Sequence, residues 1–79
     1  MQRYTISTPL VAVRLFRSQE TEKAGVMISL PADALVEIHG PSDLGTGMIE
    51  VAWEHQRYAV FECDLATRAA LVQVAVAGD

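Results

Sequence analysis

Short apolar runs that alternate residue by residue with polar ones, each ended by turn-forming residues, constrain this chain most strongly. The cleanest run covers residues 48–54, in which Ile49, Val51 and Trp53 fall on one side of an alternating pattern. Alternation with a period of two places side chains on opposite faces of a strand, whereas a helix repeats every 3.6 residues. The pattern therefore predicts β-strands.

The same alternation recurs along the whole sequence, and loops rich in Gly, Pro and charged residues separate the runs. This punctuation is typical of an all-β domain. We expect strands at residues 10–15, 26–30, 36–39, 48–54, 58–61 and 71–76, and residues 3–7 are a candidate for a short first strand. We expect loops or turns at residues 17–25, 31–34, 40–47 and 54–57.

The segment after the last aromatic residue is ambiguous. Residues 63–69 have helical spacing, which predicts a single turn of 3₁₀- or α-helix. Residues 65–76 are rich in alanine and could instead form one amphipathic helix. The strict alternation of Val72, Val74 and Val76 favours a strand, because β-branched residues pack well on a pleated sheet.

A chain of 79 residues forms one domain, residues 1–79, and 51% of it is apolar. An open, flat sheet of this composition would expose an apolar face and two unpaired edges. Closing the sheet removes both problems. The expected fold is therefore a closed or nearly closed barrel of five to six short antiparallel strands, with the helical turn near residues 63–69.

Charge and cysteine content exclude several classes of function. The formal net charge is −4, and the six basic residues are scattered, so binding to a nucleic-acid backbone is disfavoured. The single cysteine rules out an intramolecular disulfide. No run approaches the roughly 20 apolar residues of a membrane span, and no secretory signal is visible. We expect a cytoplasmic protein that binds neither nucleic acid nor membrane.

The order of these features resembles that of bacterial SH3-like domains over about residues 10–65. The matching pieces are Val13-Arg14-Leu15, Ile28-Ser29-Leu30-Pro31, Val36-Glu37-Ile38, Ile49-Glu50-Val51-Ala52-Trp53, Tyr58-Ala59-Val60-Phe61 and Asp64-Leu65. The glycine usual after Leu-Pro is absent, and Tyr58-Ala59 replaces the usual Gly-Trp pair. The resemblance implies an SH3-like barrel, but it implies neither proline-rich nor cell-wall peptide binding and carries no function of its own.

Residue patterns for catalysis or metal binding are weak. Gly40 and Gly45 are spaced as in a phosphate-binding loop, but Thr46 stands where the lysine is required, so a hairpin loop is the simpler interpretation. The two histidines and Cys63 lack the spacing of a metal site. Cys63 could act as a nucleophile, but a lone cysteine more often behaves as a small buried apolar residue. We therefore expect a non-enzymatic protein with no metal and no cofactor.

Aromatic residues give the best lead to a binding surface. Trp53 and Tyr58 flank a predicted hairpin and would lie close to each other across it. Trp53 shares a face with Ile49 and Val51, which favours the core for it, and Phe61 is also expected in the core. Tyr58 is the aromatic residue that we expect to be exposed.

These observations predict a small binding or adaptor module that acts through a protein partner. Its surface would comprise loops 17–23 and 40–47 together with Tyr58. The candidate binding residues are Tyr58, Arg17, Glu20, Asp43 and Arg57. One alternative is a structural homo-oligomer that pairs through strand 71–77 and an exposed Met27 or Met48. Another is a small enzyme or toxin-like effector on the same barrel.

Overall fold

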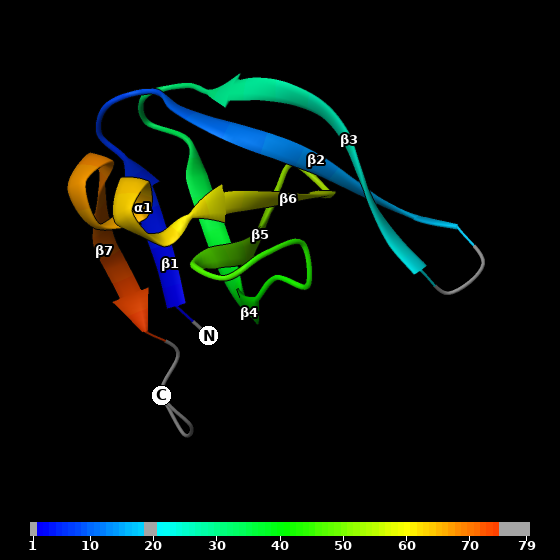
Figure 1. Cartoon of the computed structure of the whole chain (residues 1–79). Helices are drawn as coiled ribbons and strands as arrows, with labels where there is room; N and C mark the ends of the chain where they lie inside the picture. The colour runs from blue at the N-terminus through cyan, green and yellow to red at the C-terminus, as the bar shows by residue number, and fades with distance from the viewer. Residues whose placement is uncertain (1, 19–20, 75–79) are drawn as a thin grey trace.

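The computed structural model describes residues 2–18 and 21–74, and it confirms an all-β fold with one short helix (Figure 1). The elements in chain order are β1 (Gln2–Ile6), β2 (Leu10–Ser18), β3 (Thr21–Leu30), β4 (Leu35–Pro41), β5 (Met48–Trp53), β6 (Gln56–Phe61), α1 (Glu62–Arg68) and β7 (Ala69–Val74). Among the described residues, no helix has the length and apolarity needed to cross a membrane.

The strands form a single antiparallel sheet in the order β3-β2-β6-β5-β4-β1-β7. It contains seven strands, rather than the expected five to six, and it is not closed, so the expected closed or nearly closed barrel is not confirmed. Strands β3 and β7 are the two edges, and Figure 1 shows them at opposite sides of the molecule. The sheet is not closed, but it is twisted and strongly curved. This curvature encloses the apolar side chains of one face.

One apolar cluster fills the concave side of this curved sheet. Tyr4, Ile28, Ile38, Ile49, Trp53 and Ala69 are partly buried and pack against it. Its buried members come from six strands, the turn before β4 and the helix: Ile6, Leu10, Ala12, Leu30, Ala34, Val36, Val51, Tyr58, Val60 and Leu65. Leu65 is the one buried residue of α1, so this short helix closes part of the core that strands alone would leave open.

The charged segment 17–25 does not form the expected loop. Strand β2 runs on to Ser18 and pairs with β3, with Phe16 opposite Lys23 and Ser18 opposite Thr21. Figure 1 shows this hairpin projecting away from the rest of the sheet. Among its described side chains, Phe16, Val26 and Met27 are exposed. A ladder that is solvated on both faces can form without the apolar alternation that reveals a half-buried strand. The charged composition therefore concealed the two strands.

The turn between β5 and β6 is shorter than the predicted segment 54–57. Only Glu54 and His55 lie outside the strands, and Trp53 pairs directly with Gln56. Both turn residues have positive φ, 49° for Glu54 and 66° for His55. A two-residue turn with both φ values positive matches the right-handed twist of the flanking strands, which explains why so tight a connection is possible.

The C-terminal part follows the strand prediction rather than the long helix. Helix α1 begins at Glu62, close to the predicted segment 63–69, and ends at Arg68. The alternative helix over 65–76 is wrong, because β7 starts at Ala69 and pairs antiparallel with β1. Residues 75–77 of the predicted strand lie outside the described residues. Residues 69–74 form a strand because they pair with the open edge of β1, and this pairing satisfies the backbone hydrogen-bonding groups of β1.

The glycine-rich connection between β4 and β5 is a loop, as predicted, although Gly40 and Pro41 still belong to β4. The backbone N–H of Ser42 donates to the carbonyl of Met48 at 2.9 Å, and the Ser42 hydroxyl accepts from the N–H of Leu44 at 3.2 Å. At its far end, the carbonyl of Gly47 accepts from the N–H of Glu62 at 2.8 Å. These bonds tie the loop to the start of α1.

Candidate functional site

Tyr58, the first predicted binding residue, lies in the core. It is 7% exposed, because the β5–β6 register places it opposite Val51 on the concave face. The prediction of an exposed Tyr58 is therefore wrong. The sequence did contain the correct signal, since Tyr58 alternates in phase with Val60, which is also buried.

The other predicted residues come from different elements. Arg17 belongs to the projecting β2–β3 hairpin, and Glu20 lies outside the described residues. Asp43 is exposed in the β4–β5 loop, and Arg57 lies on β6. No hydrogen bond or ion pair between Asp43 and Arg57 is found in the described part of the chain.

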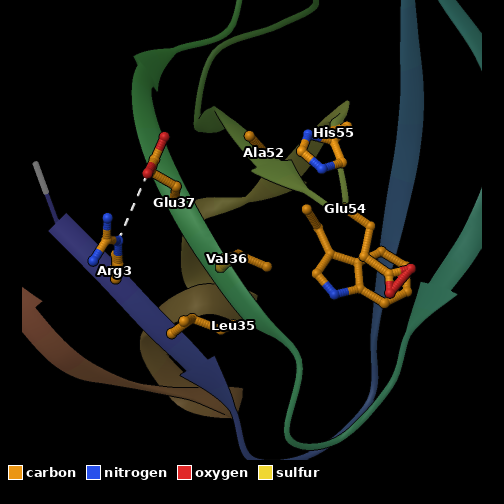
Figure 2. A pocket seen from close by; sticks show the side chains of 8 residues that line it. Arg3, Leu35, Val36, Glu37, Ala52, Glu54 and His55 are labelled. Carbon is orange, nitrogen blue, oxygen red and sulfur yellow. Dashed lines mark ion pairs between the residues drawn. The ribbon is translucent and has the colours of Figure 1, made fainter.

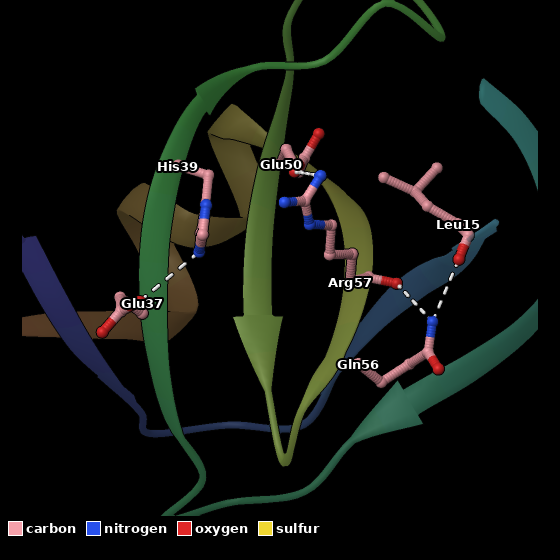
Figure 3. A network of polar contacts seen from close by, with 6 residues as sticks. All are labelled: Leu15, Glu37, His39, Glu50, Gln56 and Arg57. Atoms are coloured by element: carbon pink, nitrogen blue, oxygen red, sulfur yellow. Dashed lines mark hydrogen bonds and ion pairs between the residues drawn. The ribbon is translucent and has the colours of Figure 1, made fainter. Parts of the chain in front are cut away.

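Arg57 takes part in a polar network on the convex face (Figure 3). Its Nη1 lies 3.3 Å from Oε2 of Glu50 on the neighbouring strand. Next to it, Nε2 of Gln56 donates to the carbonyl of Leu15 at 3.0 Å, and Oε1 of Gln56 accepts from Nη2 of Arg14 at 3.1 Å. This network links β5, β6 and β2, so Arg57 is accounted for by its role in holding the sheet together.

A groove opens where β4 and β5 separate. The two strands pair up to Glu37 and Ala52, and the ladder ends there because the chain turns at Glu54 immediately after Trp53. Beyond this pair, Leu35 and Val36 have no partner on β5. The resulting groove has a volume of about 450 Å³. Its lining consists of Arg3, Leu35, Val36, Glu37, Ala52, Trp53, Glu54 and His55. We call it the Trp53 groove.

Figure 2 shows how this lining divides between two walls. Arg3 and Glu37, from β1 and β4, stand on one side, and Ala52, Glu54 and His55, from β5 and its turn, stand on the other. Val36 lies between them and is fully buried, so the floor of the groove is the edge of the core itself. The groove therefore combines an apolar floor with charged walls.

The backbone of Leu35 also faces the groove. The N–H of Ile6 donates to the carbonyl of Ala34 at 2.9 Å, which shows that even-numbered residues of β4 bond to β1. In an antiparallel ladder, alternate residues direct their N–H and C=O groups to opposite sides. The backbone groups of Leu35 consequently point toward β5, at the position where the β4–β5 ladder has ended.

Trp53 forms the apolar wall of the groove, and the ring of Tyr58 packs against it from the core side. Trp53 is half-buried and packs against the core, where its ring centroid lies 6.2 Å from that of Tyr58, with an interplanar angle of 49°. The two residues were expected to lie close to each other across the hairpin, and the β5–β6 register brings their rings together. Trp53 packs against the core and also lines the groove.

The carboxylate on one wall of the groove is paired, and the carboxylate on the other wall is not paired with any described residue. Nε of Arg3 lies 3.6 Å from Oε2 of Glu37, and Oε1 of the same carboxylate lies 3.4 Å from Nε2 of His39. The carboxylate of Glu54, on the opposite wall, has no ion pair or hydrogen bond to any other described residue. The Trp53 side of the groove is therefore the electrostatically negative side.

A second hollow, of about 540 Å³, lies at the start of α1 and is lined by Thr46, Gly47, Phe61, Glu62, Cys63 and Ala66. Phe61 is 45% exposed and Cys63 is exposed, so neither is the buried residue that the sequence suggested. Phe61 follows the last core residue of β6 and alternates outward. No group of three or more His, Cys, Asp or Glu side chains that could hold a metal ion occurs among the described residues.

Sequence reasoning missed most of the groove. Leu35, Ala52 and Glu54 carry no motif, and they come together only because one strand ends before its neighbour does. The available signal was the polar turn directly after Trp53, which marks the end of β5. Comparison of the chain with protein-family models, curated proteins and solved structures finds no match.

Proposed function

We propose that this domain is a non-enzymatic binding module, and that it docks an extended segment of a partner protein in the Trp53 groove. The observation that carries the proposal is the half-buried Trp53 beside an interrupted ladder. An indole supplies a large apolar contact area at low cost in conformational entropy, and Trp is enriched among the residues that dominate binding energy.

The backbone geometry supports an extended ligand in particular. Leu35 offers an N–H and a C=O toward the groove, and a peptide strand can bond to such groups as a short addition to the sheet. The Leu35 side chain is half-exposed and Val36 forms the floor, so alternate side chains of the ligand would meet apolar surface. Backbone bonds would then supply affinity, and the walls would supply selectivity.

The proposal includes the SH3-like relation that the sequence suggested. Support comes from the order of elements: a long hairpin β2–β3, a meander β4–β5–β6, a short helix, and a last strand that returns beside β1. This relation bears on architecture alone, because a fold shared with binding domains does not identify a ligand.

A second candidate function, self-association, is favoured by the exposed apolar residues of the β2–β3 ribbon. Val26 and Met27 on edge strand β3 are 64% and 68% exposed, and Val11 and Phe16 on β2 are also exposed. An edge strand with apolar side chains is a template for pairing with another chain. Strand β7, the other edge, presents the exposed Leu71 and Val72.

The test of the docking proposal is a selection of displayed random peptides on the immobilised domain. Selected peptides are then titrated into ¹⁵N-labelled protein. We expect the largest amide shifts at Leu35 and Val36 and at the indole N–H of Trp53. Leu35→Glu should weaken binding at least about tenfold, because it places a charge where an apolar side chain of the ligand would pack.

Leu71→Glu is the matched control, since Leu35 and Leu71 are both 51% exposed and Leu71 does not line the groove. It should leave the affinity within about twofold, as a substitution outside the contact surface does. A selection that enriches no peptide, or shifts that cluster away from the groove, would show the proposed function to be wrong.

A further inference from the structure

The two carboxylates that line the groove, Glu37 and Glu54, differ in their ion pairs, and this difference determines where a charged ligand group can bind. Glu37 is engaged by Arg3 at 3.6 Å and by His39 at 3.4 Å. Glu54 is exposed, and the described residues offer its carboxylate neither an ion pair nor a hydrogen bond. A ligand cation therefore has one available carboxylate in this groove, and that carboxylate is next to Trp53.

The indole of Trp53 strengthens the same preference. The face of an indole ring carries negative electrostatic potential and attracts Lys and Arg side chains that lie within about 6 Å of its centroid. Trp53 and Glu54 are consecutive residues, and both line the groove. A side chain with a long apolar stem and a cationic head could pack its stem on the indole and place its head beside the carboxylate.

We infer that the Trp53 groove selects a lysine or arginine side chain of an extended peptide, held by the Trp53 ring and the Glu54 carboxylate. This inference rests on the proposed function and names the chemistry of its partner. The position within the groove follows from the Arg3–Glu37 ion pair, which leaves the opposite wall without an available carboxylate (Figure 2). The basic side chain therefore lies at the end nearest the β5–β6 turn.

The charge of the whole chain acts in the same direction. With a net charge of −4, the domain attracts basic segments at long range and repels acidic ones. A neutral side chain at this position would gain the apolar contact alone. An acidic side chain would lie against Glu54 and lose binding, so the selectivity order is basic, then neutral, then acidic.

The test uses four capped peptides of sequence Thr-Val-X-Val-Thr, in which X is Lys, Arg, Gln or Glu. Each is titrated into the labelled full chain at low salt, and binding is followed at the Trp53 indole N–H and the Leu35 amide. We expect dissociation constants for the Lys and Arg peptides to be lower by about tenfold than for the Gln peptide. The advantage should shrink as salt is added.

The decisive variant is Glu54→Gln, which should reduce the preference for Lys over Gln to about twofold while the Gln peptide binds as before. Glu62→Gln, at the start of α1 and outside the groove, removes the same charge and should leave the preference intact. Equal reductions in both variants would assign the effect to net charge and overturn the inference.

Other outcomes separate the inference from the proposed function. Equal binding of the Lys and Gln peptides, with shifts still in the groove, would overturn selection of a basic side chain and leave docking in place. Preference for the Glu peptide would overturn it, because the groove would then attract an anion. Failure of the Lys and Arg peptides to bind at the groove would also overturn it, whereas the docking proposal depends on the display selection.

Discussion

The rings of Trp53 and Tyr58 meet across the β5–β6 hairpin, with their centroids 6.2 Å apart and their planes at 49°. Tyr58 is buried and Trp53 is half-buried, so the two residues connect the core to the groove wall. Tyr58 therefore acts as a positioning residue for Trp53. Any change that removes its ring should alter both the stability of the domain and the shape of the groove.

The first prediction concerns this ring. Tyr58→Ala should lower the free energy of unfolding by about 3–5 kcal/mol, the usual cost of deleting a large buried aromatic side chain. The Tyr58 hydroxyl forms no hydrogen bond with another described residue, and no buried side-chain oxygen among these residues lacks a hydrogen-bond partner. The hydroxyl therefore reaches solvent. Tyr58→Phe should lower the free energy of unfolding by less than about 1 kcal/mol. Urea unfolding measures both. Equal losses in the two variants would mean that the hydroxyl, rather than the ring, is what matters.

The second prediction concerns the two-residue turn that ends β5. His55 has φ of 66°, a left-handed conformation that costs most residues about 1–2 kcal/mol and glycine almost nothing. His55→Gly should therefore raise the free energy of unfolding by about 1 kcal/mol. His55→Ala removes the same imidazole but keeps the strain, so it should give no such gain. A melting temperature that rises equally for both variants would refute the role of the backbone.

The third prediction concerns the register shift between β4 and β5. Ile38 pairs with Val51 and Gly40 with Glu50, so β4 contains one extra residue, and Gly40 has φ of 131°. Gly40→Ala should cost about 1–3 kcal/mol through backbone strain alone, because a Cβ there would contact nothing within 4 Å.

Gly45→Ala is the matched control for the third prediction. A Cβ at this position would be in ordinary contact with Met48, 3.8 Å from its sulfur, and the residue is not in the left-handed region. Its unfolding free energy should stay within about 1 kcal/mol of the original value. Equal destabilisation by both variants would indicate that the loop tolerates no side chain, whatever its backbone conformation.

Alternation predicted most of the sheet because burial of one face imposes it. Strands β4, β5 and β6 were recognisable from residues such as Val36, Val51 and Val60, all of which are core. The β2–β3 ribbon was misread as a loop beyond Arg17, because a ladder that is solvated on both faces needs no apolar pattern. Closure was not confirmed, because alternation identifies buried faces and is silent on whether the edge strands meet.

The candidate site was less predictable than the fold. Trp53 and Tyr58 were expected to lie close together across a hairpin, but Tyr58 rather than Trp53 was chosen as the exposed binding residue. The groove itself depends on where pairing stops between Glu37 and Ala52, and no local pattern encodes the length of a neighbouring strand. Burial of Tyr58 was missed although Tyr58 alternates in phase with the buried Val60.

The last prediction tests self-association through β3. Met27 is 68% exposed on an edge strand, so Met27→Lys should alter the free energy of unfolding by less than about 0.5 kcal/mol. A lysine on a sheet edge opposes pairing with a second copy. If β3 joins two copies, the solution mass from light scattering should rise with concentration for the original chain and stay at the monomer value for Met27→Lys.

Ala66→Lys supplies the matched control, since it adds the same charge at an exposed position of α1, far from β3 in the topology. It should leave the concentration dependence unchanged. A monomeric mass for the original chain at every concentration would remove the second candidate function and leave docking in the Trp53 groove as the one proposal. Equal loss of association in both variants would instead assign the effect to overall charge, because a specific edge contact depends on position.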